Sequence, residues 1–345
     1  MNKVILFTVM LLSSISGMSQ NFQTSNEIYV CPPCGSECDK TEHHGPGVCK
    51  HCNMPLIKKN AAKTIAFYLQ DGVEVLDFAG PLEVFAYAGY QVFTVSATQE
   101  PIKSQGVLTV VPDYSVENAP EADILAFFGG NSGAASQNKK VIEWVTKQSD
   151  VDYHFSVCTG AFVLAEAGIL DGKIATTFHS ALDNLEAGYP KIDVRKNVRF
   201  VDNGKVITTA GISAGIDGAL HLVAKLQGLN AAKRTAYYME YDNWNLGDGL
   251  ILAEDNPYLK TVQVSFLKNF EGTYEHKNGG KLELVYDTKN NNLVALMDGN
   301  EFPIYHETED VFSDVGGEPV FFKRNTNGDI EGYAQEENGE IFKKL

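Results

Sequence analysis

The sequence is poor in positive charge and in long apolar stretches. It has 28 lysine and arginine residues against 44 aspartate and glutamate residues, which gives a formal net charge of −16. Such a chain repels the phosphates of nucleic acids and of anionic membrane surfaces, so we expect neither as a partner. A membrane-spanning helix needs about 20 consecutive apolar residues. No stretch of the sequence meets that requirement.

One shorter apolar run, Val4–Leu12, follows the positively charged Lys3 and precedes the small and polar residues 13–20. This layout is typical of a secretory signal peptide. We therefore expect residues 1–19 to be removed and the mature protein to be periplasmic or secreted, without insertion in the membrane. The alternative is that this run is an N-terminal strand of the core.

Cysteine is scarce outside one short segment. Five of the six cysteines lie between Cys31 and Cys52, and the sixth, Cys158, stands alone. Clustered cysteines in an exported protein often form disulfides, but here four of them form two C-x-x-C pairs. Each pair directs two thiolates at one point, and two pairs complete a tetrahedral site.

This spacing predicts a zinc-ribbon-like module over residues 27–59, stabilised by structural zinc or another thiophilic metal. The predicted metal ligands are Cys31, Cys34, Cys49 and Cys52. Two alternatives stay open, namely a module that handles metal actively and a module closed by disulfides. The roles of four further potential ligands also stay open: Cys38, His43, His44 and His51.

The same segment resembles the small heavy-metal-binding domain of bacterial metal transporters and efflux adaptors. The resemblance rests on Tyr-x-Cys-Pro at Tyr29–Pro32 and on Pro-Gly-x-Cys-x-x-Cys-x-Met-x-Leu at Pro46–Leu56. Cys34 departs from that family, which usually has histidine at this position.

From residue 63 to residue 242, β-rich apolar runs alternate with segments of helical spacing. This alternation predicts an α/β domain with a doubly wound parallel sheet covered on both faces. The expected strands are 64–69, 91–97, 106–111, 123–128, 153–157, 173–177 and 205–209. The expected helices are 74–86, interrupted at Gly80-Pro81, and 139–148, 159–167, 212–227 and 231–241.

Cys158 stands where the apolar strand 153–157 ends and the small residues 159–161 open a helix. A side chain at such a turn lies at the carboxyl end of a parallel strand, where open α/β sheets place their sites. The helix N-terminus favours the thiolate, which is the nucleophilic form. A buried structural cysteine is the alternative.

The central region resembles the ThiJ/PfpI superfamily, which has a class I glutamine-amidotransferase-like, flavodoxin-like fold. Within it, the isonitrile-hydratase-like branch, which also includes the ligand-sensing domains of some AraC-type regulators, is the most similar. The matching stretches are Asp71–Phe85, Phe128–Gly130, Ser156–Ala165, Gly168–Thr177 and Thr209–Asp217.

The resemblance implies roles for four residues. Cys158 would be the nucleophile and Asp77 the neighbouring carboxyl that holds and donates a proton. Gly130 and Thr159 would direct backbone N–H groups at the reacting centre. His179 lies near a histidine of some relatives, but one position away from that of the nearest branch, so its catalytic role is an open alternative. The resemblance also implies a homodimer, a small-molecule substrate and no catalytic cofactor.

These roles fit isonitrile hydration, in which a thioimidate forms on Cys158 and water releases a formamide. Two other functions stay open. One is a thiol or oxidative-stress sensor or chaperone-like binding protein with a metal-binding N-terminus. The other is glyoxalase-like chemistry on reactive aldehydes, also centred on Cys158.

The last part of the chain changes character. We interpret residues 243–269 as a connector. Residues 270–345 contain short alternating runs separated by turns such as Asp298-Gly299 and Asn338-Gly339, which predict a small antiparallel β meander or barrel. With Gly272-Thr273-Tyr274, Phe312, Val320–Arg324 and Gly328, the segment resembles a domain of unknown function found on some β-lactamase-like proteins. We expect it to be structural, to cover the substrate, or to bind a separate ligand.

Overall fold

The computed structural model describes residues 28–345 except for 33, 60–62, 243 and 260. The predicted signal peptide, residues 1–19, lies outside this part of the chain. Within the described residues, no helix combines the length and the apolar character needed to cross a membrane.

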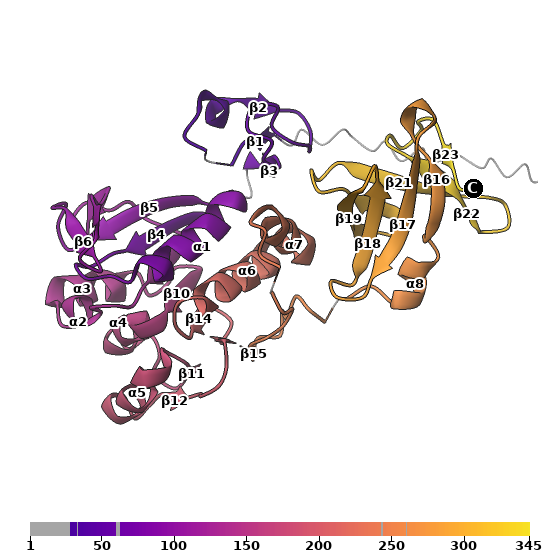
Figure 1. The fold of residues 1–345 in the computed structure, drawn as a ribbon. Helices are drawn as coiled ribbons and strands as arrows, with labels where there is room; N and C mark the ends of the chain where they lie inside the picture. Colours follow the sequence, from indigo (N-terminus) through magenta and orange to yellow (C-terminus); the bar gives the residue numbers. More distant parts are fainter. Residues whose placement is uncertain (1–27, 33, 60–62, 243, 260) are drawn as a thin grey trace, which may run out of the picture.

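The central domain is built on a single eight-stranded sheet with the strand order β15-β13-β14-β10-β9-β4-β5-β8 (Figure 1). All its strand pairs are parallel except β13 with β14. The strands are β4 (Thr64–Tyr68), β5 (Gln91–Ser96), β8 (Tyr114–Ser115), β9 (Ile124–Phe127), β10 (Tyr153–Val157), β13 (Phe200–Asp202), β14 (Val206–Thr209) and β15 (Leu250–Ile251). This architecture confirms the predicted α/β class with a largely parallel sheet.

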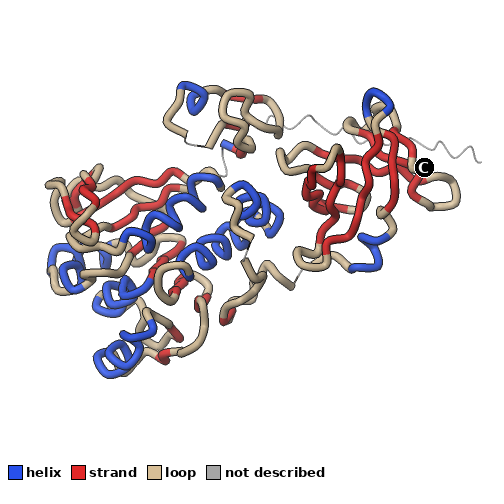
Figure 2. The backbone as a smooth tube through the Cα atoms, viewed as in Figure 1, coloured by secondary structure: helices blue, strands red, loops and turns tan. Residues whose placement is uncertain are grey.

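Helices cover both faces of this sheet, as Figure 2 shows in blue against red. The apolar core on one face contains side chains of α1 (Val75–Tyr87), α6 (Ala214–Gln227) and α7 (Leu229–Tyr238). The core on the other face contains side chains of α2 (Gly133–Ser136), α3 (Lys139–Lys147), α4 (Ala161–Glu166) and α5 (Leu182–Gly188). The strands between them are buried on both sides, which explains why β4 and β9 are almost continuously apolar.

The prediction of an interruption at Gly80-Pro81 was wrong, because α1 runs through both residues. Close packing of α1 against α6 explains the difference. A Cβ at Gly80 would lie 2.7 Å from Ile216 Cγ1, and Pro81 Cγ lies 3.3 Å from the Cβ position of Gly215. The two residues therefore let the helices approach, and tertiary packing overrides the local helix-breaking tendency.

Two predicted strands lie outside the central sheet. The run 106–111 contributes β7 (Leu108–Val110), which pairs with β6 (Ile102–Ser104) in a separate hairpin. The run 173–177 contributes β11 (Ile174–Ala175), which pairs with β12 (Asp193–Val194). The predicted helix 159–167 begins with a 3-10 turn, η3 (Cys158–Gly160), before α4. Another 3-10 turn, η4 (His179–Ala181), precedes α5.

The C-terminal region is an eight-stranded antiparallel meander in sequential order, which confirms the predicted all-β architecture. Its strands are β16 (Gly272–Glu275), β17 (Lys281–Asp287), β18 (Asn292–Met297), β19 (Asn300–Thr308), β20 (Val311–Ser313), β21 (Pro319–Arg324), β22 (Ile330–Ala334) and β23 (Phe342–Lys343); a 3-10 turn, η5 (Lys277–Gly279), follows β16. A bridge between Tyr274 and Lys344 brings the last strand back to the first, so the barrel is nearly closed.

The segment between the central domain and the barrel packs against both of them. Leu250 and Ile251 form β15 at the edge of the central sheet, whereas α8 (Val264–Lys268) packs against the barrel strand β17. Helix α7 also faces the barrel, where Asn230 Nδ2 donates to the His306 carbonyl at 2.6 Å and Arg234 donates to Ser313 Oγ at 2.9 Å.

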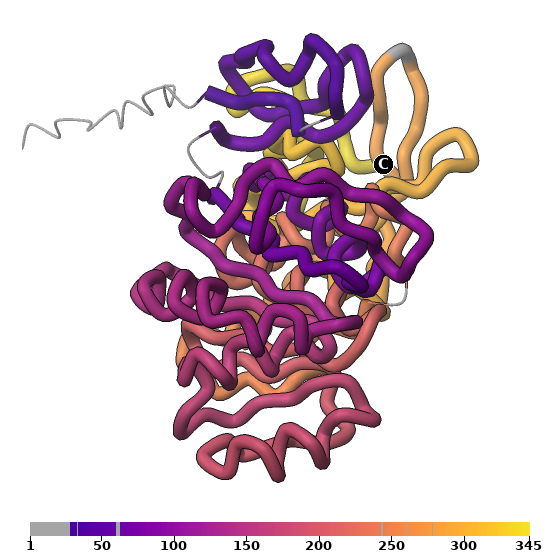
Figure 3. The backbone as a smooth tube through the Cα atoms, turned by 90° about the vertical axis from the view of Figure 1, so that its left-hand side faces the viewer, coloured from indigo at the N-terminus to yellow at the C-terminus, as the bar shows by residue number. Residues whose placement is uncertain are grey.

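The cysteine-rich N-terminal module lies at one end of both larger units, as the two views in Figures 1 and 3 agree. It has three short strands in the order β2-β1-β3, namely β1 (Tyr29–Val30), β2 (Glu42–His43) and β3 (Ile57–Lys58), and a 3-10 turn, η1 (Glu37–Lys40). Ile57 contacts Gly89 of the central domain, and Gly47 contacts Glu318 of the barrel.

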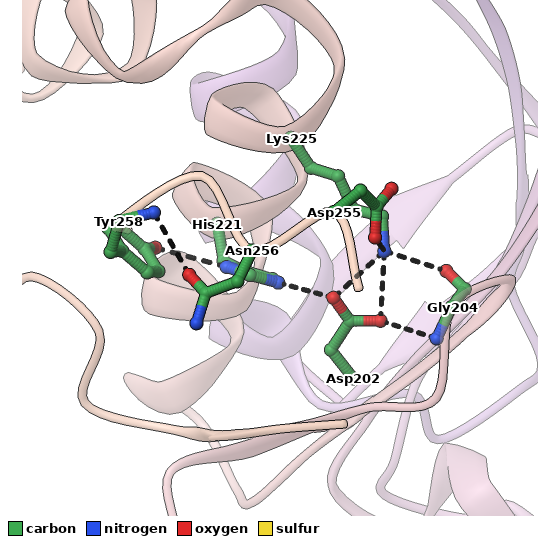
Figure 4. Close-up of polar contacts among 7 residues, drawn as sticks. All are labelled: Asp202, Gly204, His221, Lys225, Asp255, Asn256 and Tyr258. Atoms are coloured by element: carbon green, nitrogen blue, oxygen red, sulfur yellow. Dashed lines mark hydrogen bonds and ion pairs between the residues drawn. The ribbon is translucent and has the colours of Figure 1, made fainter. Parts of the chain in front are cut away.

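A buried polar network ties the segment after β15 to the central domain (Figure 4). Asp202 is fully buried, and its carboxylate lies 2.9 Å from both His221 Nε2 and Lys225 Nζ. The segment supplies Tyr258, whose hydroxyl lies 3.0 Å from His221 Nδ1, and Asp255, whose carboxylate lies 2.9 Å from Lys225 Nζ. Burial opposes ionisation of Asp202, but bonds from His221 and Lys225 hold its pKa below the usual value.

Replacing Asp202 with alanine is expected to destabilise the protein by about 3–5 kcal/mol, because it leaves the ammonium of Lys225 buried with one partner fewer. The side chain of Lys225 is 1% exposed. Urea denaturation at pH 7 measures this loss. The matched control is Asp255→Ala, which removes the exposed partner of the same lysine and should cost no more than about 1 kcal/mol. Equal losses in the two variants would contradict the assignment.

Candidate active site

Cys158 occupies a strained turn at the carboxyl end of β10. Its φ is 58°, in the left-handed region that a non-glycine residue rarely adopts. The turn is fixed from both sides, because Cys158 N–H donates to the Ala210 carbonyl at 3.0 Å and Thr177 Oγ1 donates to the Cys158 carbonyl at 2.7 Å. These bonds hold the sulfur at the strand end in the way that nucleophile turns require.

Asp77, on the first turn of α1, is fully buried next to this turn. Its Oδ2 accepts the Gly129 N–H at 2.9 Å and its Oδ1 accepts the Ile212 N–H at 3.0 Å. The two donors come from the residues that follow β9 and β14. The carboxyl group is thus held between the ends of two strands that flank β10 in the sheet.

The side chains of Asp77 and Cys158 both lie close to the α-carbon of Gly129. A Cβ at that residue would lie 2.7 Å from Asp77 Oδ2 and also 2.7 Å from the Sγ of Cys158. Real Cβ atoms do not approach other heavy atoms so closely, so only glycine leaves room for the pair. Sequence reasoning missed the role of Gly129, although the double glycine after a buried strand was the available signal.

The two side chains form a coupled acid pair. Burial raises the pKa of Asp77 to about 6, against the lowering effect of the Gly129 and Ile212 N–H groups. Burial and the negative charge of Asp77 raise the pKa of the Cys158 thiol to about 12, although backbone N–H groups of Thr159 and Gly130 lower it. The helix N-terminus alone favours the thiolate, but desolvation of the buried sulfur acts in the opposite direction and is the larger effect. At neutral pH the pair holds one proton, on sulfur, beside a carboxylate that can receive it.

The structure brings Gly130 and Thr159 to the same sulfur. The backbone N–H groups of both residues lie close enough to Cys158 to lower the pKa of its thiol. Gly130 has a φ of 84°, and a Cβ there would lie 2.2 Å from the Gly72 carbonyl oxygen, so the turn needs glycine for two reasons. These N–H groups can stabilise negative charge on the sulfur as it forms. The Thr159 hydroxyl contacts the Gly130 carbonyl at 3.4 Å.

His179 is not brought into this group. It is exposed, and its ring centroid lies 4.2 Å from that of Phe178. Within the described residues, no polar contact joins His179 to Cys158 or Asp77. Phe178 in turn packs over Gly211, where a Cβ would lie 2.3 Å from its ring. The arrangement favours the surface role of His179.

Ile212 is a second residue that sequence reasoning missed. It has a φ of 56°, which is a rare conformation for a β-branched residue, and its N–H is thereby aimed at Asp77. The strained backbone at Ile212 therefore helps to hold the Asp77 carboxylate in place. The stretch 209–217 belonged to the sequence resemblance, but periodicity gave no sign of the left-handed residue.

A cavity of about 550 Å³ adjoins the nucleophile turn. Thr159 forms part of its wall, whereas Cys158 does not, since that side chain is only 6% exposed. The wall is otherwise formed by Ser132, Gly133, Ser136, Gln137, Phe162, Glu166, Ala181, Asn184, Gly188 and Tyr189. A small molecule in this space would contact Thr159, the residue that follows Cys158.

The cysteines of the N-terminal module gather into one cluster. Cys31 Sγ lies 3.2 Å from Cys52 Sγ, and Cys34 Sγ lies 3.3 Å from Cys38 Sγ. Of the predicted ligands, Cys31, Cys49 and Cys52 come together with Cys38, whereas Cys34 lies beside Cys31, Cys38 and Asp39. Backbone N–H groups of Cys52 and His51 lower the pKa of Cys49 to about 7. Such soft donors fit zinc or another thiophilic ion.

Comparison with known proteins gives the central domain its family. The sequence model of the DJ-1/PfpI family matches residues 63–225. Isonitrile hydratase from Pseudomonas putida is 35% identical over 186 residues, which are 52% of this chain and 79% of that protein. The chain belongs to the DJ-1/PfpI family. This confirms the predicted superfamily, and the matched region contains Asp77, Gly130, Cys158 and Thr159.

The chain is also similar to a protein named as a transcriptional regulator. The HTH-type transcriptional regulator CdhR from Pseudomonas aeruginosa is 30% identical over 169 residues, which are 47% of this chain and 50% of that regulator. Among solved structures, a ThiJ/PfpI family protein from Pseudomonas syringae is 30% identical, with 54% of this chain and 79% of that chain covered and a TM-score of 0.49.

Proposed function

We propose that the central domain is an isonitrile hydratase, which converts an isonitrile and water into an N-substituted formamide. The observation that carries the proposal is the Asp77–Cys158 pair, in which a buried carboxylate stands beside a thiol at a nucleophile turn. The similarity to isonitrile hydratase from Pseudomonas putida supports it.

The first half of the reaction forms a covalent bond to sulfur. Asp77 takes the proton of Cys158 as the sulfur attacks the terminal carbon of the isonitrile. The same proton then passes from the Asp77 carboxyl to that carbon, which leaves a thioimidate in which carbon bears one hydrogen. The N–H groups of Gly130 and Thr159 stabilise the negative charge that sulfur carries on the way.

The second half releases the product. Water adds to the carbon–nitrogen double bond of the thioimidate, with its oxygen on carbon and one proton on nitrogen. The carbon–sulfur bond breaks, the second proton returns to sulfur by way of Asp77, and an N-substituted formamide leaves. The sum is one isonitrile and one water consumed for one formamide, so no redox partner is needed.

The sensor alternative is weaker on physical grounds. A redox-sensing cysteine reacts as an accessible thiolate, whereas Cys158 is 6% exposed and its pKa is raised to about 12 by burial and by Asp77. Glyoxalase-like chemistry would use the same pair, so substrate choice is the experimental discriminator. We also propose that the mature protein is exported and forms a homodimer.

The test is turnover by the mature protein of one alkyl and one aryl isonitrile, with methylglyoxal as the competing substrate class. We expect formamide release from an isonitrile that saturates with substrate, and its loss in Cys158→Ala. If the aldehyde alone is consumed, the glyoxalase alternative replaces the hydratase. If no isonitrile is turned over, the proposal fails.

A further inference from the structure

The cysteine cluster of the N-terminal module contains two overlapping sets of donor atoms. One set is Cys31, Cys38, Cys49 and Cys52, and the other is Cys31, Cys34, Cys38 and Asp39. Within each set the donor atoms all lie within 4.8 Å of one another. The sets share Cys31 and Cys38. The five thiols and one carboxylate therefore form two adjacent candidate metal centres that have these two cysteines in common.

The spacing of the two shared sulfurs matches that of ligands around a metal. A tetrahedral zinc ion with zinc–sulfur bonds of about 2.3 Å places its sulfurs about 3.8 Å apart. The sulfurs of Cys31 and Cys38 are 3.9 Å apart, whereas the closest pairs, at 3.2 and 3.3 Å, must open by about 0.5 Å to hold an ion between them. A disulfide needs a sulfur–sulfur distance of about 2.05 Å, which none of these pairs has.

We propose that this module binds two thiophilic divalent ions, zinc in the ordinary case, bridged by the thiolates of Cys31 and Cys38. Cys49 and Cys52 are the terminal ligands of the first ion, and Cys34 and Asp39 those of the second. Each ion then has four donors, the number that closed structural zinc sites use. The proposal adds a second ion to the single site that paired C-x-x-C spacing predicts.

Charge permits a second ion. A divalent ion with four thiolates has a net charge of −2, and two divalent ions with five thiolates and one carboxylate have the same net charge. Cys31 and Cys49 are both buried, and the second ion with its ligands adds no uncompensated charge there. Cys34 and Asp39 are half-buried, so solvent reaches the donors proposed for the second ion.

Asp39 is already held in the position of a ligand. Its Oδ2 accepts the Gly35 N–H at 2.9 Å, both of its oxygens accept the Cys34 N–H at 3.1 Å, and its Oδ1 lies 3.0 Å from Cys34 Sγ. The backbone N–H groups thus hold the carboxylate with Oδ1 beside a sulfur of the proposed second centre. Asparagine at position 39 keeps an oxygen that can accept the loop N–H groups but lacks the negative charge. The variant Asp39→Asn therefore tests metal binding while the loop keeps its hydrogen bonds.

The test is the metal content of the mature full-length protein, purified without chelator and measured by elemental analysis and native mass spectrometry. We expect about two zinc ions per chain. Cys34→Ser and Asp39→Asn should each lower the content to about one, while Glu37→Gln, an exposed acidic neighbour on the same turn, should keep two. Far-UV circular dichroism of each variant checks that the fold is retained.

Cadmium substitution provides a readout that does not depend on these variants. Two ¹¹³Cd resonances with mutual coupling are expected, because shared thiolates connect the ions. One zinc per chain in the wild type would overturn the proposal. So would two ions that persist in both Cys34→Ser and Asp39→Asn, two uncoupled cadmium signals, or a metal-free protein without free thiols in the module.

Discussion

Gly129→Ala is expected to lower kcat/KM for isonitriles at least about 10²-fold, the cost typical of displacing reacting groups by about 1 Å. The added methyl group would lie 2.7 Å from both Asp77 Oδ2 and Cys158 Sγ, so at least one of the two must move. Gly129 does not adopt a positive φ, and alanine can therefore keep its backbone conformation. The expected loss is accordingly one of site geometry.

Gly45→Ala is the control for this variant. It adds the same methyl group outside the central domain, at a residue without a positive φ where no heavy atom lies within 4 Å of the added Cβ. We expect wild-type kinetics from this control. Steady-state kinetics and thermal melting of both variants separate a damaged site from a damaged fold. Wild-type turnover by a folded Gly129→Ala protein would show that Asp77 and Cys158 need not meet.

Asp77→Asn is expected to lower kcat by about 10²- to 10⁴-fold, the usual contribution of a positioned acid–base group. It should also change the pH profile. Burial raises the pKa of Asp77 to about 6, so in the wild type the carboxylate that receives the thiol proton disappears as pH falls through about 6. The acidic limb of kcat/KM should therefore lie near pH 6 and should be absent from the residual activity of Asp77→Asn.

Glu74→Gln is the control for this second prediction. Glu74 precedes α1, and its negative charge raises the pKa of Asp77. Removing that charge should leave kcat nearly unchanged and move the acidic limb slightly toward lower pH. The assignment of Asp77 fails if Asp77→Asn retains the wild-type rate, or if its acidic limb stays where the wild type has it.

The burial that raises the pKa of Asp77 also lowers the stability of the folded protein at neutral pH. In the unfolded chain an aspartate ionises near pH 3.8, whereas Asp77 in the folded protein ionises near pH 6. The folded state thus binds the proton more tightly, and stability is lost as pH rises from about 4 to about 6. Above pH 6 the full cost is present, on the order of 3 kcal/mol.

Strand positions and the nucleophile turn were predictable because both depend on local pattern. The run 153–157 is β10 to the residue, since its β-favouring residues Tyr153, Phe155 and Val157 alternate along it and small residues begin where it ends. Cys158 follows from that ending. Asp77 was predictable only through the family resemblance, because 81 positions separate it from Cys158 and no periodicity links them.

Other features of the site depend on contacts between residues that lie far apart in the sequence. The direction of the Cys158 pKa shift depends on how deeply the turn is buried, and helix-terminus reasoning alone gives the opposite sign. The left-handed Ile212 depends on the bond its N–H makes to Asp77. In the cysteine module, C-x-x-C spacing pairs Cys34 with Cys31 but gives no sign that the fold also brings Cys38 to Cys49 and Cys52.

The most direct test of the account is a search for the covalent intermediate on Cys158. Mature protein is mixed with excess isonitrile, quenched with acid within the first turnover, digested and analysed by mass spectrometry. We predict that the peptide containing Cys158 gains the mass of one isonitrile and loses it again as formamide appears. Formamide release without this adduct, an adduct on another residue, or undiminished turnover by Cys158→Ala would contradict the account.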